Sequence, residues 1–102
     1  MGEFVKVAKT SEIGPGEAKT VEVKGTVIGL FNVDGQYYAI ENTCTHVGGP
    51  LAEGMIDGDE VTCPWHGARF KISTGEVLGP PAQSDVATYT VRVQGDDIEI
   101  EI

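Results

Sequence analysis

Apolar side chains recur mainly at every second position of this chain, in short runs that turn residues separate. The clearest run is the last, where Ile98, Ile100 and Ile102 alternate with Glu99 and Glu101. Successive side chains of a β-strand point to opposite faces, so this run predicts a strand with its isoleucines turned inward and its glutamates outward. Similar runs, many rich in β-branched residues, predict further strands over residues 5–8, 21–23, 27–33, 36–40, 60–62, 69–72, 76–78 and 86–93.

Turn residues separate these runs at short intervals. Asp34-Gly35 is a strong hairpin signal between residues 27–33 and 36–40. Further turns are predicted at Asp57-Gly58-Asp59, Ser73-Thr74-Gly75 and Gln94-Gly95-Asp96. Fourteen glycines and five prolines in 102 residues fit short strands joined by tight turns. The pattern predicts an all-β domain, a small antiparallel sandwich or barrel, with at most one helical turn at residues 51–53.

Composition narrows the class of protein further. A length of 102 residues suits one domain with a modest core. The net charge of −9 argues against nucleic-acid binding, which requires a basic surface. The sequence contains no apolar run long enough to span a bilayer, and its first ten residues have no apolar signal core, so we expect no membrane association.

Potential metal ligands gather in two short motifs. The chain has two cysteines and two histidines, and they form the pairs Cys44–His46 and Cys63–His66, with sixteen residues between the pairs. Two thiolates and two imidazoles make a set of four ligands for a metal centre. Because this set leaves no cysteine for a disulfide, the composition also favours a reducing cytoplasm.

Two kinds of centre suit these ligands. Zinc binds cysteine and histidine tetrahedrally, but structural zinc sites usually pair two cysteines across about two to four residues and two histidines across about three to five. Here each pair mixes one cysteine with one histidine. Mixed pairs favour a binuclear [2Fe–2S] centre, in which the cysteines bind one iron and the histidines bind the other. A structural zinc module remains the alternative.

Longer stretches around both pairs resemble a known family. Cys44-Thr45-His46-Val47-Gly48-Gly49-Pro50-Leu51 is similar to the first cluster-binding loop of Rieske proteins, and Cys63-Pro64-Trp65-His66-Gly67-Ala68-Arg69-Phe70 to the second. Ser73-Thr74-Gly75-Glu76 and Gly79-Pro80-Pro81-Ala82 resemble the turn and the proline loop that follow in that family. The chain thus resembles small soluble Rieske ferredoxins, and the resemblance implies one Rieske-type [2Fe–2S] cluster per chain.

The resemblance also implies a role for each of these residues. Cys44 and Cys63 would bind the inner iron, and His46 and His66 the outer iron near the surface. Four further residues are candidates, on their own side chains, for shielding the cluster or contacting a partner, with packing between the loops as the alternative for Trp65: Pro50, Trp65, Pro80 and Pro81. The expected layout is a single Rieske domain, with base sheets from roughly residues 1–42 and 83–102 and an inserted cluster-binding subdomain at roughly residues 43–82.

Differences from the respiratory Rieske proteins point to a low reduction potential. Those relatives carry two further cysteines that form a disulfide, at positions that Gly49 and Trp65 occupy here. They also place a serine and a tyrosine hydroxyl near the cluster, where this chain has Ala68 and Phe70. Neither side chain can donate a hydrogen bond to a sulfur, so the reduced cluster is less stabilised and the potential is expected to be low.

The expected function is electron transfer without catalysis. After the four ligands, the sequence has no histidine or cysteine left for acid–base or nucleophilic chemistry. By resemblance, the donor would be a flavin-dependent ferredoxin reductase and the acceptor a terminal oxygenase, and we expect the carrier to be a monomer. A Rieske-type small subunit of a larger reductase, such as nitrite reductase, is a second interpretation. The acidic residues Glu53, Asp57, Asp59 and Glu60 could steer a basic partner or simply form a solvated hairpin surface.

Overall fold

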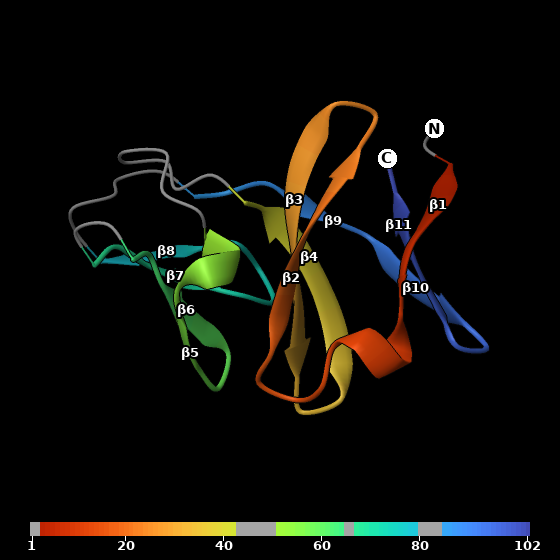
Figure 1. Ribbon diagram of the computed structural model, residues 1–102. Helices are drawn as coiled ribbons and strands as arrows, with labels where there is room; N and C mark the ends of the chain where they lie inside the picture. The colour runs from red at the N-terminus through yellow and green to blue at the C-terminus, as the bar shows by residue number, and fades with distance from the viewer. Residues whose placement is uncertain (1–2, 43–50, 65–66, 80–84) are drawn as a thin grey trace.

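The strands of the protein lie in antiparallel sheets arranged side by side (Figure 1). A computed structural model describes residues 3–42, 51–64, 67–79 and 85–102 of the chain. Within these ranges the elements are β1 (Phe4–Lys9), η1 (Thr10–Glu12), β2 (Ala18–Val23), β3 (Thr26–Val33), β4 (Gln36–Glu41), η2 (Leu51–Glu53), β5 (Met55–Asp57), β6 (Glu60–Thr62), β7 (Arg69–Lys71), β8 (Val77–Gly79), β9 (Thr88–Tyr89), β10 (Val91–Gln94) and β11 (Asp97–Glu101). The η elements are short 3₁₀ helices, and the all-β prediction is confirmed.

The described strands form three sheets. One has the order β1-β11-β10, the central one β2-β3-β4-β9, and the third β5-β6-β7-β8. Strands from the two ends of the chain meet in the first sheet, where Val5 is paired with Ile100. The third sheet comes from residues 55–79 alone and lies at the opposite end of the molecule, at the left of Figure 1.

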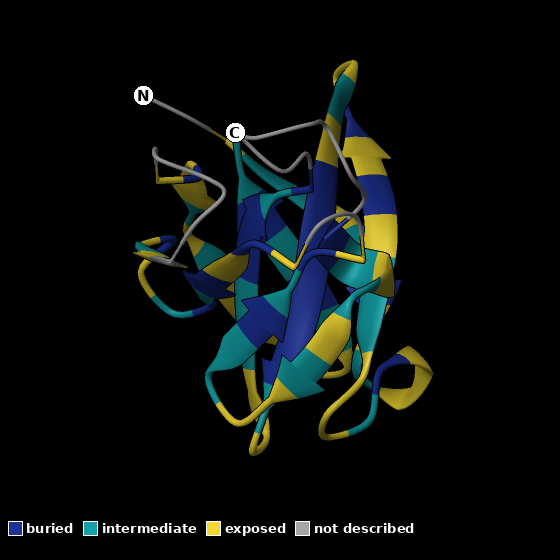
Figure 2. Cartoon of the chain, turned by 90° about the vertical axis from the view of Figure 1, so that its left-hand side faces the viewer, coloured by how far each residue is buried: buried dark blue, intermediate teal, exposed yellow. Residues whose placement is uncertain are grey.

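The central sheet is covered on both faces. In β3, Ile28 and Leu30 belong to a buried cluster shared with the β1-β11-β10 sheet, whereas Phe31 belongs to a second cluster shared with the β5-β6-β7-β8 sheet. Residues 28–32 are therefore buried without interruption (Figure 2). A strand that is buried on both faces needs a continuous apolar run, which explains why residues 27–33 do not alternate strictly.

The predicted hairpin at Asp34-Gly35 is confirmed. Val33 pairs with Gln36, so these two residues form the whole loop between β3 and β4. Both adopt positive φ angles, 52° for Asp34 and 90° for Gly35. A two-residue loop with two positive φ angles matches the right-handed twist of its strands, and Asp-Gly is among the sequences that adopt it readily.

The single strand that the pattern predicts over residues 86–93 is wrong. Thr88 and Tyr89 pair with Ile40 and Ala39 of β4, whereas residues 91–94 pair with β11 in a different sheet. The strand breaks at Thr90, whose carbonyl accepts a hydrogen bond from the Glu101 amide at 2.9 Å. An alternating pattern indicates an extended backbone but not its pairing partner, so it could not locate this change of sheet.

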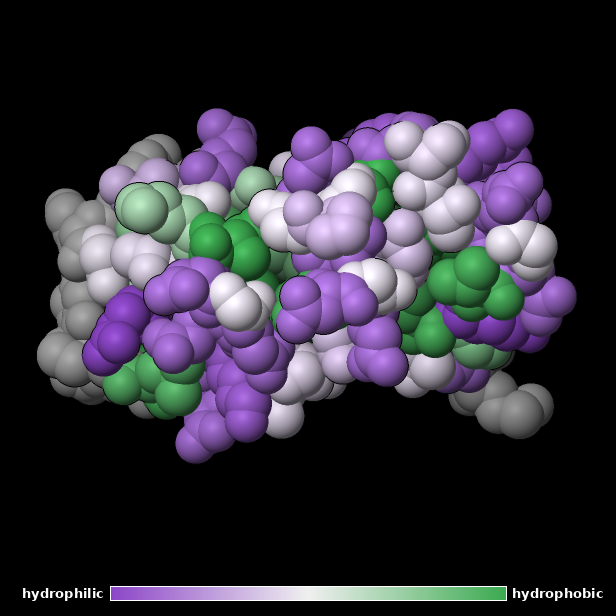
Figure 3. Space-filling view, turned by 90° about the horizontal axis from the view of Figure 1, so that it is seen from below, coloured by the Kyte–Doolittle hydropathy of each residue, from purple (hydrophilic) through white to green (hydrophobic). Residues whose placement is uncertain are grey.

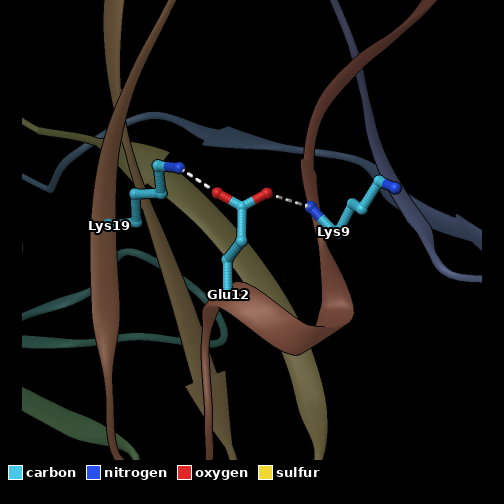
Figure 4. Close-up of polar contacts among 3 residues, drawn as sticks. All are labelled: Lys9, Glu12 and Lys19. Atoms are coloured by element: carbon cyan, nitrogen blue, oxygen red, sulfur yellow. Dashed lines mark hydrogen bonds and ion pairs between the residues drawn. The ribbon is translucent and has the colours of Figure 1, made fainter.

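The sequence pattern did not predict the 3₁₀ helix η1, which connects β1 to β2. The Glu12 carboxylate joins the two strands, because it accepts a hydrogen bond from the Lys9 amide at 2.8 Å and pairs with the Lys19 ammonium (Figure 4). The hydrogen bond from Lys19, with that from the Lys9 amide, lowers the pKa of Glu12.

In the described ranges, no helix has the length and apolar character needed to cross a membrane.

Gly75 provides a test of the packing between the third sheet and the chain that returns to the centre. Its φ angle is +75°, and a Cβ there would fall 2.3 Å from the Val86 carbonyl oxygen. We expect Gly75→Ala to lose roughly 1–2 kcal/mol of unfolding free energy from the positive φ and about 1–3 kcal/mol more from the steric conflict. Urea unfolding of the iron-loaded protein measures both effects.

Gly95→Ala is the matched control for that substitution. Gly95 also has a positive φ, +62°, but a Cβ there would have no heavy atom within 4 Å other than those of Gly95 and its two chain neighbours. Its replacement should therefore cost only the conformational part, roughly 1–2 kcal/mol. Equal losses in the two variants would contradict a steric role for Gly75.

Candidate metal centre

Of the four predicted ligands, Cys63 lies within the described ranges. Cys44, His46 and His66 lie outside them, as do the predicted shielding or docking residues Pro50, Trp65, Pro80 and Pro81. Among the described residues no group of three or more histidine, cysteine, aspartate or glutamate side chains gathers to bind a metal. The geometry of the candidate centre therefore comes from Cys63 and from the residues that flank the other segments.

Cys63 directly follows β6 and is buried, with 1% of its surface exposed. Its amide donates a hydrogen bond to the Ala68 carbonyl at 2.7 Å, which closes the loop between β6 and β7 at its base. Gly67, inside this loop, has a φ of 75°, a conformation that glycine adopts without steric cost. The hairpin therefore positions the thiol of Cys63 at the inner end of the loop, within the core.

The segment that contains Cys44 and His46 is closed at its base in a similar way. The Leu51 amide donates to the Asn42 carbonyl at 2.7 Å, and the Ala52 amide donates to the Asn42 side-chain oxygen at 2.8 Å. Asn42 directly follows β4, and Leu51 begins η2. These two bonds hold together the described residues on either side of the segment 43–50.

A third closure lies at the predicted proline loop. The Val77 amide donates a hydrogen bond to the Asp85 carboxylate at 2.9 Å, which links β8 to the residue that follows the segment 80–84. Two residues further along, Ala87 and Glu41 are joined by a backbone hydrogen bond of 2.8 Å. The chain that leaves this loop is thereby attached to the end of β4, next to Asn42.

One hydrophobic cluster joins the bases of the two ligand loops. Leu51, Cys63 and Ala68 belong to it, and each is at most 1% exposed. The approach is close, because a Cβ at Gly54 would fall 2.0 Å from the carbonyl oxygen of Thr62, the residue before Cys63. The fold thus brings the ends of the two segments that contain the Cys–His pairs to the same core.

Ala68 and Phe70 are fully buried in the same cluster as Cys63. Neither side chain carries a hydrogen-bond donor. The side of the core around Cys63 is therefore apolar at these two positions.

The acidic residues at this end of the molecule do not form one uniform charged surface. Asp59 accepts hydrogen bonds from the Ser73 amide at 2.9 Å and from its hydroxyl at 2.6 Å, so its carboxylate stabilises the turn after β7. Glu60 lies 3.6 Å from the Arg69 guanidinium. Glu53 and Asp57 are exposed. Seen from below, hydrophilic side chains cover much of the described surface, with small separate apolar patches (Figure 3).

Sequence reasoning overlooked Asn42 and Asp85, whose side chains close two of the loops. Both lie beside the motifs, but a lone asparagine or aspartate next to a loop is common and carries no distinctive pattern. The feature that distinguishes Asn42 is its burial, with 6% of its surface exposed. Burial depends on tertiary packing and cannot be read from the neighbouring residues.

The donor set suits a Rieske cluster. Two thiolates and two imidazoles provide both types of ligand that such a cluster requires, and the buried Cys63 suits an inner iron. Hydrogen bonds between the described residues that flank the three segments, at one end of the β domain, bring the bases of these segments together.

Comparisons with known proteins agree with this chemistry. The family model described as Rieske [2Fe-2S] domain matches residues 3–90. The biphenyl dioxygenase ferredoxin subunit of Pseudomonas sp. (strain KKS102) is 36% identical over 99 residues, which cover 96% of this chain and 91% of that protein.

Two solved structures have the same fold. The ferredoxin of Sphingomonas yanoikuyae B1 superposes with a TM-score of 0.92 at 29% identity, covering 98% of this chain and 99% of that one. A chain from the complex of reduced oxygenase and oxidized ferredoxin in carbazole 1,9a-dioxygenase superposes with a TM-score of 0.91 at 32% identity, covering 96% and 92%. The chain therefore belongs to the Rieske [2Fe–2S] domain family, and its cofactor is a Rieske-type [2Fe–2S] cluster.

Proposed function

We propose that this protein passes single electrons from a flavin-dependent reductase to the terminal oxygenase of an aromatic-ring dioxygenase system. The observation that supports this most directly is the similarity, over nearly the full length of both chains, to the ferredoxin components of such systems. The structural similarity to a chain from the oxygenase–ferredoxin complex of carbazole 1,9a-dioxygenase supports the choice of acceptor. The protein is then a carrier within an oxidoreductase system, and the chemistry on the substrate belongs to the oxygenase.

The proposed ligands are Cys44 and Cys63 for the inner iron and His46 and His66 for the outer iron. When bound, the cluster supplies a site that accepts and releases one electron. Cys63 enters this set from a buried position at the base of a closed loop, and the histidines would lie toward the surface. Pro50, Trp65, Pro80 and Pro81 are proposed to shield the cluster or to contact a partner.

The proposed domain layout follows from the sheets. Residues 43–82 would form the cluster-binding subdomain, which includes the β5-β6-β7-β8 sheet, and residues 1–42 and 83–102 would form the base. We further propose that the carrier works as a monomer in the cytoplasm, because both of its cysteines are assigned to the cluster and none is left for a disulfide.

Reconstitution tests the function. Purified protein, a flavin-dependent reductase of such a system and its terminal oxygenase should together oxidise an aromatic substrate, and omission of this protein should abolish turnover. If the protein instead co-purifies as a fixed subunit of a reductase and supports no oxygenase, the small-subunit interpretation replaces the carrier.

The first prediction concerns the cluster. The protein should be red-brown, with about two irons and two acid-labile sulfides per chain, and the average g value of its reduced EPR signal should lie below that of all-cysteine clusters. His46→Ala and His66→Ala should lose the cluster and fold less stably, because ligand binding is coupled to folding. A colourless protein with stoichiometric zinc would instead support the zinc module.

The second prediction concerns the reduction potential, which should lie near the lower end of the Rieske range, about −150 mV at neutral pH. Ala68→Ser should raise it by several tens of mV, because a hydroxyl donor would stabilise the reduced, more negative cluster, and roughly 59 mV corresponds to about 1.4 kcal/mol for one electron. Phe70→Tyr should act in the same direction. Protein-film voltammetry measures both shifts, and a wild-type potential above about +100 mV would contradict the low-potential assignment.

The third prediction concerns docking. The net charge of −9 implies partners with basic or mixed surfaces, so electron-transfer rates should fall as salt shortens the screening length from about 10 Å at 0.1 M to about 3 Å at 1 M. Glu53→Gln with Asp57→Asn should slow association at low salt, since both side chains are exposed, Asp57 at the end of β5 and Glu53 in η2 just before that strand.

Glu22→Gln with Asp96→Asn is the matched control for docking. It removes two carboxylate charges from exposed positions, Glu22 on β2 of the central sheet and Asp96 on the β10–β11 turn, neither of which belongs to the β5-β6-β7-β8 sheet. Stopped-flow rates distinguish the pairs. Equal effects from both pairs would mean that net charge, and not the acidic residues near the cluster, steers the partner.

A further inference from the structure

Asn42 is a buried side-chain amide at the junction between the central sheet and the first ligand segment. It directly follows β4, and 6% of its surface is exposed. Its backbone amide donates to the Val27 carbonyl at 3.3 Å, and its carbonyl accepts from the Leu51 amide at 2.7 Å. Its side-chain oxygen accepts from the Ala52 amide at 2.8 Å. One residue thus joins β3, the end of β4 and the start of η2.

The neighbouring strand leaves room for this side chain. A Cβ at Gly29 would lie 3.1 Å from the Asn42 side-chain oxygen and 2.8 Å from Cε1 of Phe31. Gly29 does not have a positive φ, so its backbone conformation does not require a glycine. The lack of a side chain at this position instead leaves room for Asn42 and Phe31 to pack closely. The position of the amide is therefore set by the central sheet.

The bond to Ala52 has a consequence for the cluster. It joins Asn42 and Ala52, which flank residues 43–50, while Leu51 is buried in the same cluster as Cys63. The segment that contains Cys44 and His46 therefore starts and ends at a defined place relative to the second ligand loop. Outer groups that orient ligands in this way commonly change metal affinity about 10–100-fold when they are replaced.

We propose that Asn42 is a positioning residue for the cluster. Its side-chain oxygen holds the Ala52 amide, and this bond keeps the first ligand pair in register with the second, which slows cluster release and keeps the iron environment uniform. The inference rests on the ligand set proposed above and deepens it, because it names a residue outside the motifs that supports the cluster.

The chain offers a matched control at Asn32. This asparagine is also buried, 3% exposed, and its side chain also makes hydrogen bonds to backbone groups, donating to the Ile13 carbonyl at 2.9 Å and accepting from the Gly35 amide at 2.8 Å. It lies at the β3–β4 turn, the opposite end of this hairpin from Asn42. Its loss should lower the stability of the fold without altering the ligand loops.

The experiment compares iron-loaded wild type, Asn42→Ala, Asn42→Ser, Asn42→Asp and Asn32→Ala. Cluster release into an excess of iron chelator is followed by visible absorbance, the EPR line shape of the reduced protein is recorded, and urea unfolding reports overall stability. Asn42→Ala should release its cluster about 10–100-fold faster and broaden the EPR lines. Asn42→Asp keeps an acceptor oxygen at the same reach and should release its cluster more slowly than Asn42→Ala, although the buried charge lowers its overall stability. Asn42→Ser, with a shorter reach, should also release its cluster more slowly than Asn42→Ala.

Two results would overturn the inference. One is an Asn42→Ala variant with wild-type release and line shape. The other is an Asn32→Ala variant that speeds release as much, since release would then follow stability alone. If Asn42→Ala does not accumulate, Asn42→Ser provides the same comparison. Iron and sulfide in the wild type are measured first, because their absence would refute the proposed cluster ligands rather than the role of Asn42.

Discussion

The burial of both faces of the central sheet is the constraint on which the structure depends. Phe31 and Ile40 pack on one side toward Cys63, and Ile28 and Leu30 on the other toward the strands from the two chain ends. A domain of 102 residues buries a smaller fraction of its surface on folding than a larger one. A sheet with a buried cluster on each face adds to the apolar area that so short a chain can bury. The first ligand segment begins at the end of β4 in this sheet, and the second lies between β6 and β7 of the sheet that packs against it.

Hydrogen bonds at the base of each segment support the candidate centre. Each of the three segments at this end of the molecule is tied at its base, by Asn42, by the Cys63–Ala68 backbone bond or by Asp85. Redox centres benefit from such support, because little rearrangement between oxidation states favours electron transfer and a fixed environment defines the potential. At the other end of the molecule, the Glu12 carboxylate links the end of β1 to β2 through Lys9 and Lys19.

The apolar surroundings of Cys63 and the acidic exterior play different parts. Ala68 and Phe70, buried in the same cluster as Cys63, carry no hydrogen-bond donor, which favours the predicted low potential, whereas the exposed carboxylates of Glu53 and Asp57 would act at longer range on a partner. Asp59 belongs to neither group, since Ser73 uses its carboxylate to stabilise a turn. Charge counted along the sequence therefore overstates the charge available for docking.

The sequence by itself determined the features that local chemistry specifies. Alternation in Ile98 and Ile100 and the Asp34-Gly35 pair indicate strands and a hairpin because side-chain direction and turn geometry depend on adjacent residues. The spacing of Cys44, His46, Cys63 and His66 predicts the type of centre because ligand type and loop reach are local too. Only the tertiary structure decided the strand break at Thr90, the two-sided burial of β3 and the closures at Asn42 and Asp85. Each of these depends on a partner distant in sequence, and a pattern of neighbouring residues carries no record of that partner.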